Sequence, residues 1–454
     1  MQRPAKPFTP VRFRLQPPEK QMNISIIGTG YVGLVSAACF ADLGHSVLAI
    51  DNNKSKIRSL SKGKSIIYEP GLDKILKKNI KCKRLSFSTS YIKACQADLL
   101  VLCIDTPAKK SGEPDLKNLK LALKSIAARL QKDIFIVTKS TVPIGTNKFI
   151  KNYFKRATHY KVEIISNPEF LKEGCAVEDF FNPSRIIIGF ESNASKKIMG
   201  RLYSKLKIPS KRIYYMKIES AELTKYASNS FLATKISFIN RISQISDLTN
   251  ADIHEIKMGM GSDPRIGSEF LNAGLGFGGS CFPKDIQALR NIEKKLNLDH
   301  SILSAVEEIN GQQSEIFYKK IINSIPKKNL KNTSFLIWGL SFKPNTNDIR
   351  HSIALKLVHN LAKKVKNLYL YDPVAMGEAS NLLKQYKNIS FCKSPFENIK
   401  NANALIICTE WDQFKNIDLT RLKLLKDKKI FDGRNMLNKK QISQLGVEYF
   451  GLGV

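Results

Sequence analysis

Residues 23–33 read Asn23-Ile24-Ser25-Ile26-Ile27-Gly28-Thr29-Gly30-Tyr31-Val32-Gly33, a short apolar strand that runs at once into three closely spaced glycines. A strand followed by GxGxxG and a helix is the fingerprint of a dinucleotide-binding unit. The glycines permit a tight turn and a close approach to a pyrophosphate, which the first amides of the helix, expected over Leu34–Leu43, would face. This stretch therefore predicts an α/β fold with a parallel sheet.

The next strand supports this interpretation. Val47–Ile50 is apolar and ends in Asp51, about 20 residues beyond the glycines, as the fingerprint requires. A carboxylate there binds ribose hydroxyls and repels a 2′-phosphate, so the sequence predicts NAD rather than NADP as the cofactor. Lys54 and Lys56 lie close by and would weaken that repulsion.

Polar groups recur at the ends of later strands. Ligands bind at the carboxyl ends of the strands in a doubly wound sheet, so this recurrence favours one shared crevice. The expected strands are 97–104, 134–138 and 164–166, followed respectively by Asp105-Thr106-Pro107, by Lys139-Ser140-Thr141-Val142-Pro143, and by residues 167–174, which read NPEFLKEG.

Cys281 lies in the glycine-rich stretch Gly274-Leu-Gly-Phe-Gly-Gly-Ser-Cys-Phe-Pro-Lys-Asp285. Glycines let a backbone approach a ligand closely, which a packed core does not need. We expect Ser280 to cap a helix that has Pro283 in its first turn, so that the helix dipole favours thiolate over thiol. Asp285, four residues on, would share a helix face with the sulfur. The alternative is a buried structural cysteine.

The C-terminal third repeats the first layout. Strands are expected at 335–338, followed by Gly339, at 368–371, ending in Asp372, and at 404–408, followed by Thr409-Glu410. Because GxGxxG is missing, this second Rossmann-like domain should bind a different nucleotide, with Lys343 as a phosphate contact.

A long helix is expected between the two sheets, over Ser220–Thr249. Lys225 and Asn229 are spaced to share one face, which we assign to an active site. Apolar residues on another face would pack on a neighbouring domain or subunit; they are Leu223, Ala227, Phe231, Ile236, Phe238 and Ile242. The expected domains are therefore 22–215, 216–325 and 326–454, after a Pro-rich basic leader at 1–21.

Charge is the one unusual feature of the composition. Lys and Arg total 73 against 39 acidic residues, a net charge of +34 over 454 residues. The lysines look spread out, without an arginine run or a basic strand studded with aromatic residues, so we expect a solvated surface and no nucleic-acid partner. The eight cysteines show no paired spacing and the six histidines no metal pattern, which favours reduced thiols in a cytoplasm and no metal. No stretch is long enough for a membrane span, and we expect no membrane partner.

With these residues collected, the chain resembles the UDP-glucose 6-dehydrogenase family of nucleotide-sugar dehydrogenases. The resemblance runs from Met22 to about Asn435 and rests on motifs in the family's order: GxGYVG, STVP, NPEFLKEG, KYASN, GFGGSCFPKD, GLSFKPNTNDIR, YDP, TEW and DGRN. It implies two successive NAD-dependent oxidations of the C6 alcohol of UDP-glucose, giving UDP-glucuronate, and a homodimer joined through the central helix.

The resemblance also implies roles for single residues. Cys281 would attack the C6 aldehyde, Lys225 and Asn229 would stabilise the oxyanion, and Asp285, Thr141 and Glu169 would move protons or hold water, with the general base left open. NAD binding is assigned to Gly28, Gly30, Tyr31, Val32, Gly33, Asp51, Lys56, Thr106, Thr141, Glu173, Lys284 and Arg350. UDP-sugar binding is assigned to Glu169, Phe170, Leu171, Lys172, Glu173, Lys225, Asn229, Arg265, Phe270, Gly278 and Lys343, with Arg265 reaching the partner subunit's site.

Two positions depart from the common bacterial pattern. Asn347 replaces an acid before Asp348, and His351 replaces the Glu after Arg350, which puts the local pairing of Arg350 in doubt. The alternatives are a dehydrogenase of GDP-mannose or of a UDP-N-acetylhexosamine, a two-electron hydroxyacid dehydrogenase without a nucleophilic cysteine, and a basic nucleic-acid-binding protein.

Overall fold

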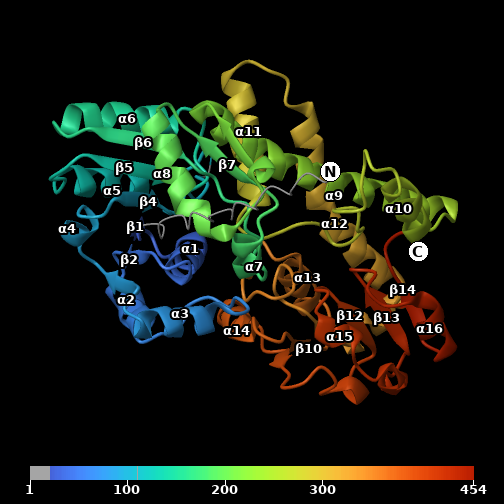
Figure 1. Ribbon diagram of the computed structural model, residues 1–454. Coiled ribbons are helices and arrows are strands. Elements are labelled where there is room, and N and C mark those ends of the chain that lie inside the picture. The colour runs from blue at the N-terminus through green and yellow to red at the C-terminus, as the bar shows by residue number, and fades with distance from the viewer. Residues whose placement is uncertain (1–20, 110) are drawn as a thin grey trace, which may run out of the picture.

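The computed structural model describes residues 21–109 and 111–454. All but the last residue of the predicted leader lies outside this part of the chain. Figure 1 shows an N-terminal lobe in blue to green and a C-terminal lobe in orange to red, with the long helices α9 and α12 running between them. The fold is α/β, with two Rossmann-like parallel-sheet domains joined by a long central helix, as the sequence predicts.

The N-terminal lobe is built on an eight-stranded sheet of order β3-β2-β1-β4-β5-β6-β7-β8, in which only the β6–β7 pair is antiparallel. The first strand pairs along its full length with β2, in the register Asn23↔Ser46 to Ile27↔Ile50. The strands are β1 (Asn23–Ile27), β2 (Ser46–Ile50), β3 (Leu85–Ser88), β4 (Leu99–Leu102), β5 (Ile134–Thr138), β6 (Val162–Ser166), β7 (Ile186–Gly189) and β8 (Ile213–Met216). The helices are α1 (Tyr31–Asp42), α2 (Lys54–Ser61), α3 (Leu72–Lys81), α4 (Tyr91–Ala94), α5 (Lys117–Ala127), α6 (Thr146–Ala157), α7 (Ala176–Phe181) and α8 (Asn193–Tyr203).

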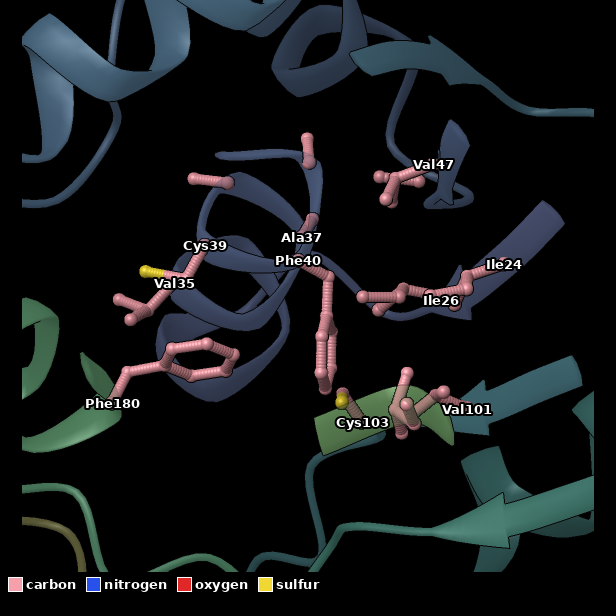
Figure 2. Packing of buried hydrophobic residues seen from close by; sticks show 14 of the residues in the cluster. Ile24, Ile26, Val35, Ala37, Cys39, Phe40, Val47, Val101, Cys103 and Phe180 are labelled. Carbon is pink, nitrogen blue, oxygen red and sulfur yellow. The ribbon is translucent and has the colours of Figure 1, made fainter. Parts of the chain in front are cut away.

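Helix α1 lies in the core of this lobe. Its residues from Gly33 to Ala41 are all buried, because the helix itself carries small and apolar side chains on every side. Figure 2 shows Phe40 of α1 with Ile26 of β1 and Cys103, the residue after β4, on one side and Phe180 of α7 on the other. The Phe40 and Phe180 rings pack edge to face, with 4.9 Å between their centroids. Burying one such side chain stabilises a fold by roughly 1.5 to 3 kcal/mol, so this packing fixes the glycine turn that precedes α1.

The C-terminal lobe repeats the N-terminal layout in a six-stranded parallel sheet of order β11-β10-β9-β12-β13-β14. The Gly28 amide donates to the Ile50 carbonyl at 2.8 Å, and the Gly339 amide donates to the Tyr371 carbonyl at the same distance. The strands are β9 (Ser334–Trp338), β10 (Asn367–Tyr371), β11 (Ile389–Phe391), β12 (Ala404–Ile407), β13 (Lys429–Asp432) and β14 (Glu448–Phe450). The helices are α13 (Ile353–Ala362), α14 (Met376–Leu383), α15 (Asp412–Lys415) and α16 (Lys439–Gln444).

Four helices connect the lobes: α9 (Ile218–Thr249), α10 (Ile253–Gly261), α11 (Phe282–Lys295) and α12 (Ser301–Asn323). Both α11 and α12 pack on α9. The predicted helix at Ser220–Thr249 is confirmed and begins two residues earlier. Of its apolar residues, Ile236 and Ile242 pack in this central region, whereas Leu223, Phe231 and Phe238 are 42%, 66% and 48% exposed.

Candidate functional site

The turn between β1 and α1 has the shape that a dinucleotide needs. Gly28 has φ +98°, and a Cβ there would lie 2.3 Å from the Cys103 carbonyl oxygen, so no other residue fits this turn. Helix α1 begins at Tyr31 with no side-chain cap, which leaves its first amides free for a pyrophosphate. The predicted fingerprint is therefore matched by the geometry.

Asp51 closes this turn from the end of β2. Its Oδ2 accepts from the Thr29 amide at 3.0 Å, the Thr29 hydroxyl at 2.8 Å and the Lys56 ammonium at 3.0 Å. Burial disfavours the charged form, but hydrogen bonds from Asn53, Lys56 and Thr29 outweigh it and hold the pKa of Asp51 below its ordinary value. An ionised Asp51 can accept a hydrogen bond from a ribose hydroxyl. The positive charge of Lys56 partly offsets the repulsion between Asp51 and a 2′-phosphate.

The other predicted strand ends also meet. The Thr106 hydroxyl donates to the Thr141 carbonyl at 2.8 Å, joining the loops after β4 and β5. The loop after β6 reaches α1, because the Gly174 amide donates to the Tyr31 hydroxyl at 2.8 Å and to Glu69 at 2.7 Å. Hydrogen bonds thus join the loop after β4 to the loop after β5, and the loop after β6 to the start of α1.

Cys281 lies where the glycine-rich loop enters α11. The helix begins at Phe282, its N-cap is Cys281 without a side-chain cap, and Pro283 lies in the first turn. The predicted cap by Ser280 is therefore wrong, because the Ser280 hydroxyl turns to Glu173, at 3.3 Å, and to the Cys281 sulfur, at 3.6 Å.

The glycines of this loop approach the protein itself. A Cβ on Gly278 would lie 2.3 Å from the His351 carbonyl oxygen, and the Gly279 amide donates to the Arg350 carbonyl at 2.9 Å. The prediction that these glycines make room for a ligand is therefore incomplete. They let the Cys281 loop pack directly on the C-terminal lobe.

Two hydrogen-bonded pairs surround the sulfur. The Lys225 ammonium donates to the Glu169 carbonyl oxygen at 2.7 Å and lies 3.0 Å from its carboxylate. The Asn229 amide donates to Asp285 at 2.6 Å, and Lys284 pairs with the other oxygen of Asp285 at 2.6 Å. Helix α9 thus presents Lys225 and Asn229 on one face, as their spacing predicts, against the loop after β6 and the start of α11.

The thiol of Cys281 is not the ready thiolate that the helix dipole predicts. Cys281 reaches the surface, yet the protein atoms packed around it desolvate the sulfur and raise its pKa above the ordinary value. Lys225 opposes this rise, and the carboxylates of Glu169 and Asp285 add to it. Burial therefore outweighs the expected preference for the thiolate, and a proton must leave the sulfur during any attack.

The C-terminal lobe contributes two basic side chains, Lys343 and Arg350. Lys343 is surrounded by protein, and this burial lowers its pKa although Glu173 raises it. Arg350 holds Asp348 through two parallel hydrogen bonds of 3.0 and 2.6 Å and lies 3.6 Å from Glu173. The doubt about Arg350 pairing is therefore resolved, since Asp348 alone engages it bidentately.

The segment from Phe170 to Lys172 is held from both sides. The Arg185 guanidinium stacks on the Phe170 ring at 3.8 Å, and the Lys225 ammonium lies 5.1 Å from that ring. The Leu171 amide donates to Glu169 at 2.6 Å, and the Lys172 amide donates to Asp179 at 2.8 Å. These contacts fix the backbone that carries Glu169.

Arg265 does not join the cluster within this chain. It is exposed and bonds Asp263, with 2.6 Å between Nη2 and Oδ2. The Phe270 ring lies edge to face with the ring of Phe282 in α11, with 6.4 Å between the ring centroids.

Sequence reasoning missed two residues that connect the parts. Glu69, from the loop before α3, contacts Tyr31 and the Gly174 amide, and no motif identified in the sequence marks this residue. Arg434 donates to the carbonyls of Cys408, Gly276 and Phe342 at 2.8, 3.2 and 3.4 Å, joining the Cys281 loop to two loops of the second sheet. The DGRN motif marks Arg434, but only the fold shows what it spans.

No helix among the described residues is both long and apolar enough to cross a membrane. Within residues 21–109 and 111–454, no three His, Cys, Asp or Glu side chains are grouped to hold a metal ion.

Comparison with known proteins gives consistent matches along the chain. Residues 22–207 match the NAD binding domain, residues 219–312 the central domain and residues 336–439 the UDP binding domain of the UDP-glucose/GDP-mannose dehydrogenase family. The chain is 41% identical to a UDP-glucose 6-dehydrogenase of Bacillus subtilis, over 95% of this chain and 98% of that one. It is 36% identical to that of Pseudomonas aeruginosa, over 95% and 97%. The solved UDP-glucose dehydrogenase of Pyrobaculum islandicum superposes with a TM-score of 0.88 at 33% identity, covering 97% of this chain and 99% of the other.

Proposed function

The chain belongs to the UDP-glucose/GDP-mannose dehydrogenase family, and we propose that it oxidises UDP-glucose to UDP-glucuronate in two NAD-dependent steps through a covalent Cys281 intermediate. It is an NAD-dependent dehydrogenase of this type. The observation that carries the proposal is the arrangement around Cys281, where Lys225, Asn229 and two carboxylates converge. A two-electron dehydrogenase has no use for a nucleophile in this position.

The first step removes a proton and a hydride from the C6 alcohol and gives an aldehyde. The Cys281 sulfur then adds to the aldehyde carbon and forms a thiohemiacetal, as the proton of the thiol is lost and the aldehyde oxygen takes up a proton. Loss of a second hydride together with the hydroxyl proton gives a thioester, and water hydrolyses it to the carboxylate, a proton and the free thiol. NAD, when bound in the N-terminal lobe, would supply the hydride acceptor for both oxidations.

Lys225 and Asn229 supply the charge and the hydrogen bond that a developing oxyanion needs. Lys225 is buried and ionised, and it forms its ion pair before any substrate arrives, so little reorganisation is needed during reaction. Proton movement falls to Glu169, Asp285 and a water held near Thr141. Glu169 contacts the ammonium directly, while Asp285 contacts the amide of Asn229.

The remaining site residues stay proposals with the roles given above. The residues proposed to bind NAD are those of the glycine turn, with Tyr31 and Val32, together with Asp51, Lys56, Thr106, Thr141, Glu173, Lys284 and Arg350. For the UDP-sugar, the segment from Glu169 to Glu173 faces Lys343 and Gly278 of the opposite wall. Lys343 would pair with the diphosphate.

UDP-glucose is preferred over other nucleotide sugars because the relatives at 36 to 41% identity are UDP-glucose 6-dehydrogenases. The solved GDP-mannose dehydrogenase of Pseudomonas aeruginosa is 26% identical with a TM-score of 0.53. We further propose a homodimer formed through the exposed apolar face of α9, the domain limits 22–215, 216–325 and 326–454, and a cytoplasmic location, in which the eight free cysteines would stay reduced.

One assay tests the reaction and the substrate together. Purified protein is incubated with NAD and, separately, UDP-glucose, GDP-mannose and UDP-N-acetylhexosamines, and NADH is counted per molecule of acid formed. The proposal requires two NADH per UDP-glucuronate. One NADH per sugar would support a two-electron enzyme, and turnover of another sugar alone would change the substrate.

A further inference from the structure

Helix α8, the loop after it and strand β8 form a basic face that the oxidation chemistry does not use. Residues 196–217 contain eight Lys or Arg and no acidic residue, against a net +34 for all 454 residues. Seven of the eight are exposed, and none forms a salt bridge within the described chain. We call these residues, with Tyr215, the α8–β8 face. The lysines, expected to be spread out along the chain, are concentrated in this segment.

Other lysine-rich segments differ from this one. Residues 319–331 carry five lysines, but Lys320 is bonded to Asp247 at 2.8 Å. Residues 74–84 carry six basic residues, with Lys78 bonded to Asp42 at 2.8 Å. Among these three segments of the described chain, the α8–β8 face alone has no ion pair to a carboxylate, so no direct partner neutralises its charges.

One aromatic side chain accompanies the charges. Among the described residues, strand β8 pairs with β7 alone and is an edge of the eight-stranded sheet. Tyr215 in this strand is 37% exposed and lies beside Lys196 of α8, with 4.7 Å between the ammonium and the ring centroid. A tyrosine has an apolar ring and a polar tip, which suits the boundary between lipid headgroups and acyl chains.

We propose that the α8–β8 face binds the surface of an anionic phospholipid bilayer. Clusters of four to eight Lys or Arg are typical of peripheral binding to anionic lipids. Six of the eight charges are lysines, compact charges that suit diffuse attraction to headgroups better than bidentate recognition.

Nucleic acid fits this face less well. Single-stranded nucleic acid needs free aromatic rings on which bases can stack. The Tyr215 ring is engaged from two directions, by Phe190 edge to face at 5.7 Å and by the Lys196 ammonium at 4.7 Å. A base therefore finds no open face of the Tyr215 ring on which to stack. A tyrosine at the boundary of the lipid headgroups needs no open ring face.

The test is vesicle sedimentation of the full chain without substrate, so that its outcome is independent of the proposed oxidation. We expect binding to vesicles of phosphatidylglycerol and phosphatidylcholine, and none to phosphatidylcholine alone. The fourfold variant Lys196→Gln, Lys197→Gln, Lys207→Gln, Lys211→Gln should lose about fivefold in partitioning per lysine, roughly a hundredfold or more in all. Retained NADH production would show that this variant is folded.

The matched control removes four charges elsewhere, as Lys319→Gln, Lys327→Gln, Lys328→Gln, Lys331→Gln, all at exposed positions. It should lose less than about fivefold in total. Equal losses in the two variants would attribute binding to net charge and overturn the proposal. Absence of vesicle binding, or tighter binding to an oligonucleotide than to vesicles at equal salt, would also overturn it.

Discussion

The Lys225 ammonium donates two hydrogen bonds to one residue, at 2.7 Å to the carbonyl oxygen and 3.0 Å to the carboxylate of Glu169. Both side chains are almost wholly buried. Burial alone would lower the pKa of Lys225, but Glu169, Cys281 and Asp285 raise it above the ordinary value, so the ammonium stays charged at neutral pH. A carbonyl oxygen that forms beside this charge is stabilised more as an anion than as a neutral group.

Lys225→Ala should therefore slow the chemistry more than it weakens binding. The loss of one oxyanion donor costs about 2.7 to 4 kcal/mol, or about a hundredfold or more in turnover. Lys225→Arg should not restore turnover, since a planar fork cannot place a compact charge at the same point. The measurement is kcat and KM for each variant. A rise in the KM for UDP-glucose at unchanged kcat would make Lys225 a ground-state ligand only.

Cys281→Ser should keep binding of NAD and UDP-glucose but stop net formation of the acid. A serine hydroxyl is harder to ionise than a thiol, and an oxygen ester hydrolyses more slowly than a thioester, so a covalent sugar adduct can accumulate. Intact-mass spectrometry after incubation with substrate, with NADH counted in parallel, measures both effects. Exposed Cys82, replaced by Ser, is the control and should turn over normally. Full turnover by Cys281→Ser would mean that the sulfur is structural.

Asp51→Ala should raise the KM for NAD and weaken discrimination against NADP, because the ribose acceptor and the repulsion of a 2′-phosphate are lost together. Lys56→Ala is the matched variant and should act in the opposite direction on selectivity, since it frees Asp51 from its 3.0 Å cationic partner. The ratio of kcat/KM for the two cofactors is the readout. An unchanged ratio in both variants would remove this pair from the cofactor site.

The fold was predictable where backbone demands are local. The strand into Gly28, the acid at position 51 and the spacing of Lys225 and Asn229 each carry their geometry in a few residues. What the sequence could not predict depends on contacts between distant segments. The Ser280 hydroxyl turns to Glu173 rather than capping α11, and the pKa of Cys281 rises because three segments enclose it. Arg434 likewise depends on loops that meet only in the fold.

Phe231→Glu should convert the proposed dimer into a monomer. Phe231 is 66% exposed on the face of α9 that also carries the exposed Leu223 and Phe238, and a charge in the middle of an apolar interface would be desolvated without a partner. Light scattering after size exclusion gives the mass of each species. Leu382→Glu, on the exposed surface of α14, is the control and should keep the wild-type mass. An unchanged mass for Phe231→Glu would place the interface elsewhere or exclude a dimer.

Glu173→Gln should make the free energy of unfolding less dependent on pH. Burial first, and then Asp348, raise the pKa of Glu173 to about 7, against the opposing effects of Arg350 and Lys343. Between about pH 4.3, where an unfolded glutamate titrates, and pH 7, the native state keeps a proton that the unfolded chain has released. This contribution therefore stabilises the fold fully below that window and is lost as the pH rises through it. A glutamine stays neutral throughout, so the Tm of Glu173→Gln minus the Tm of the wild type should increase from pH 5 to pH 8.

The control is Glu255→Gln, at an exposed position, for which the difference in Tm from the wild type should stay constant over the same pH range. A Tm difference for Glu173→Gln that is equally constant would mean that the carboxylate titrates at its ordinary pKa.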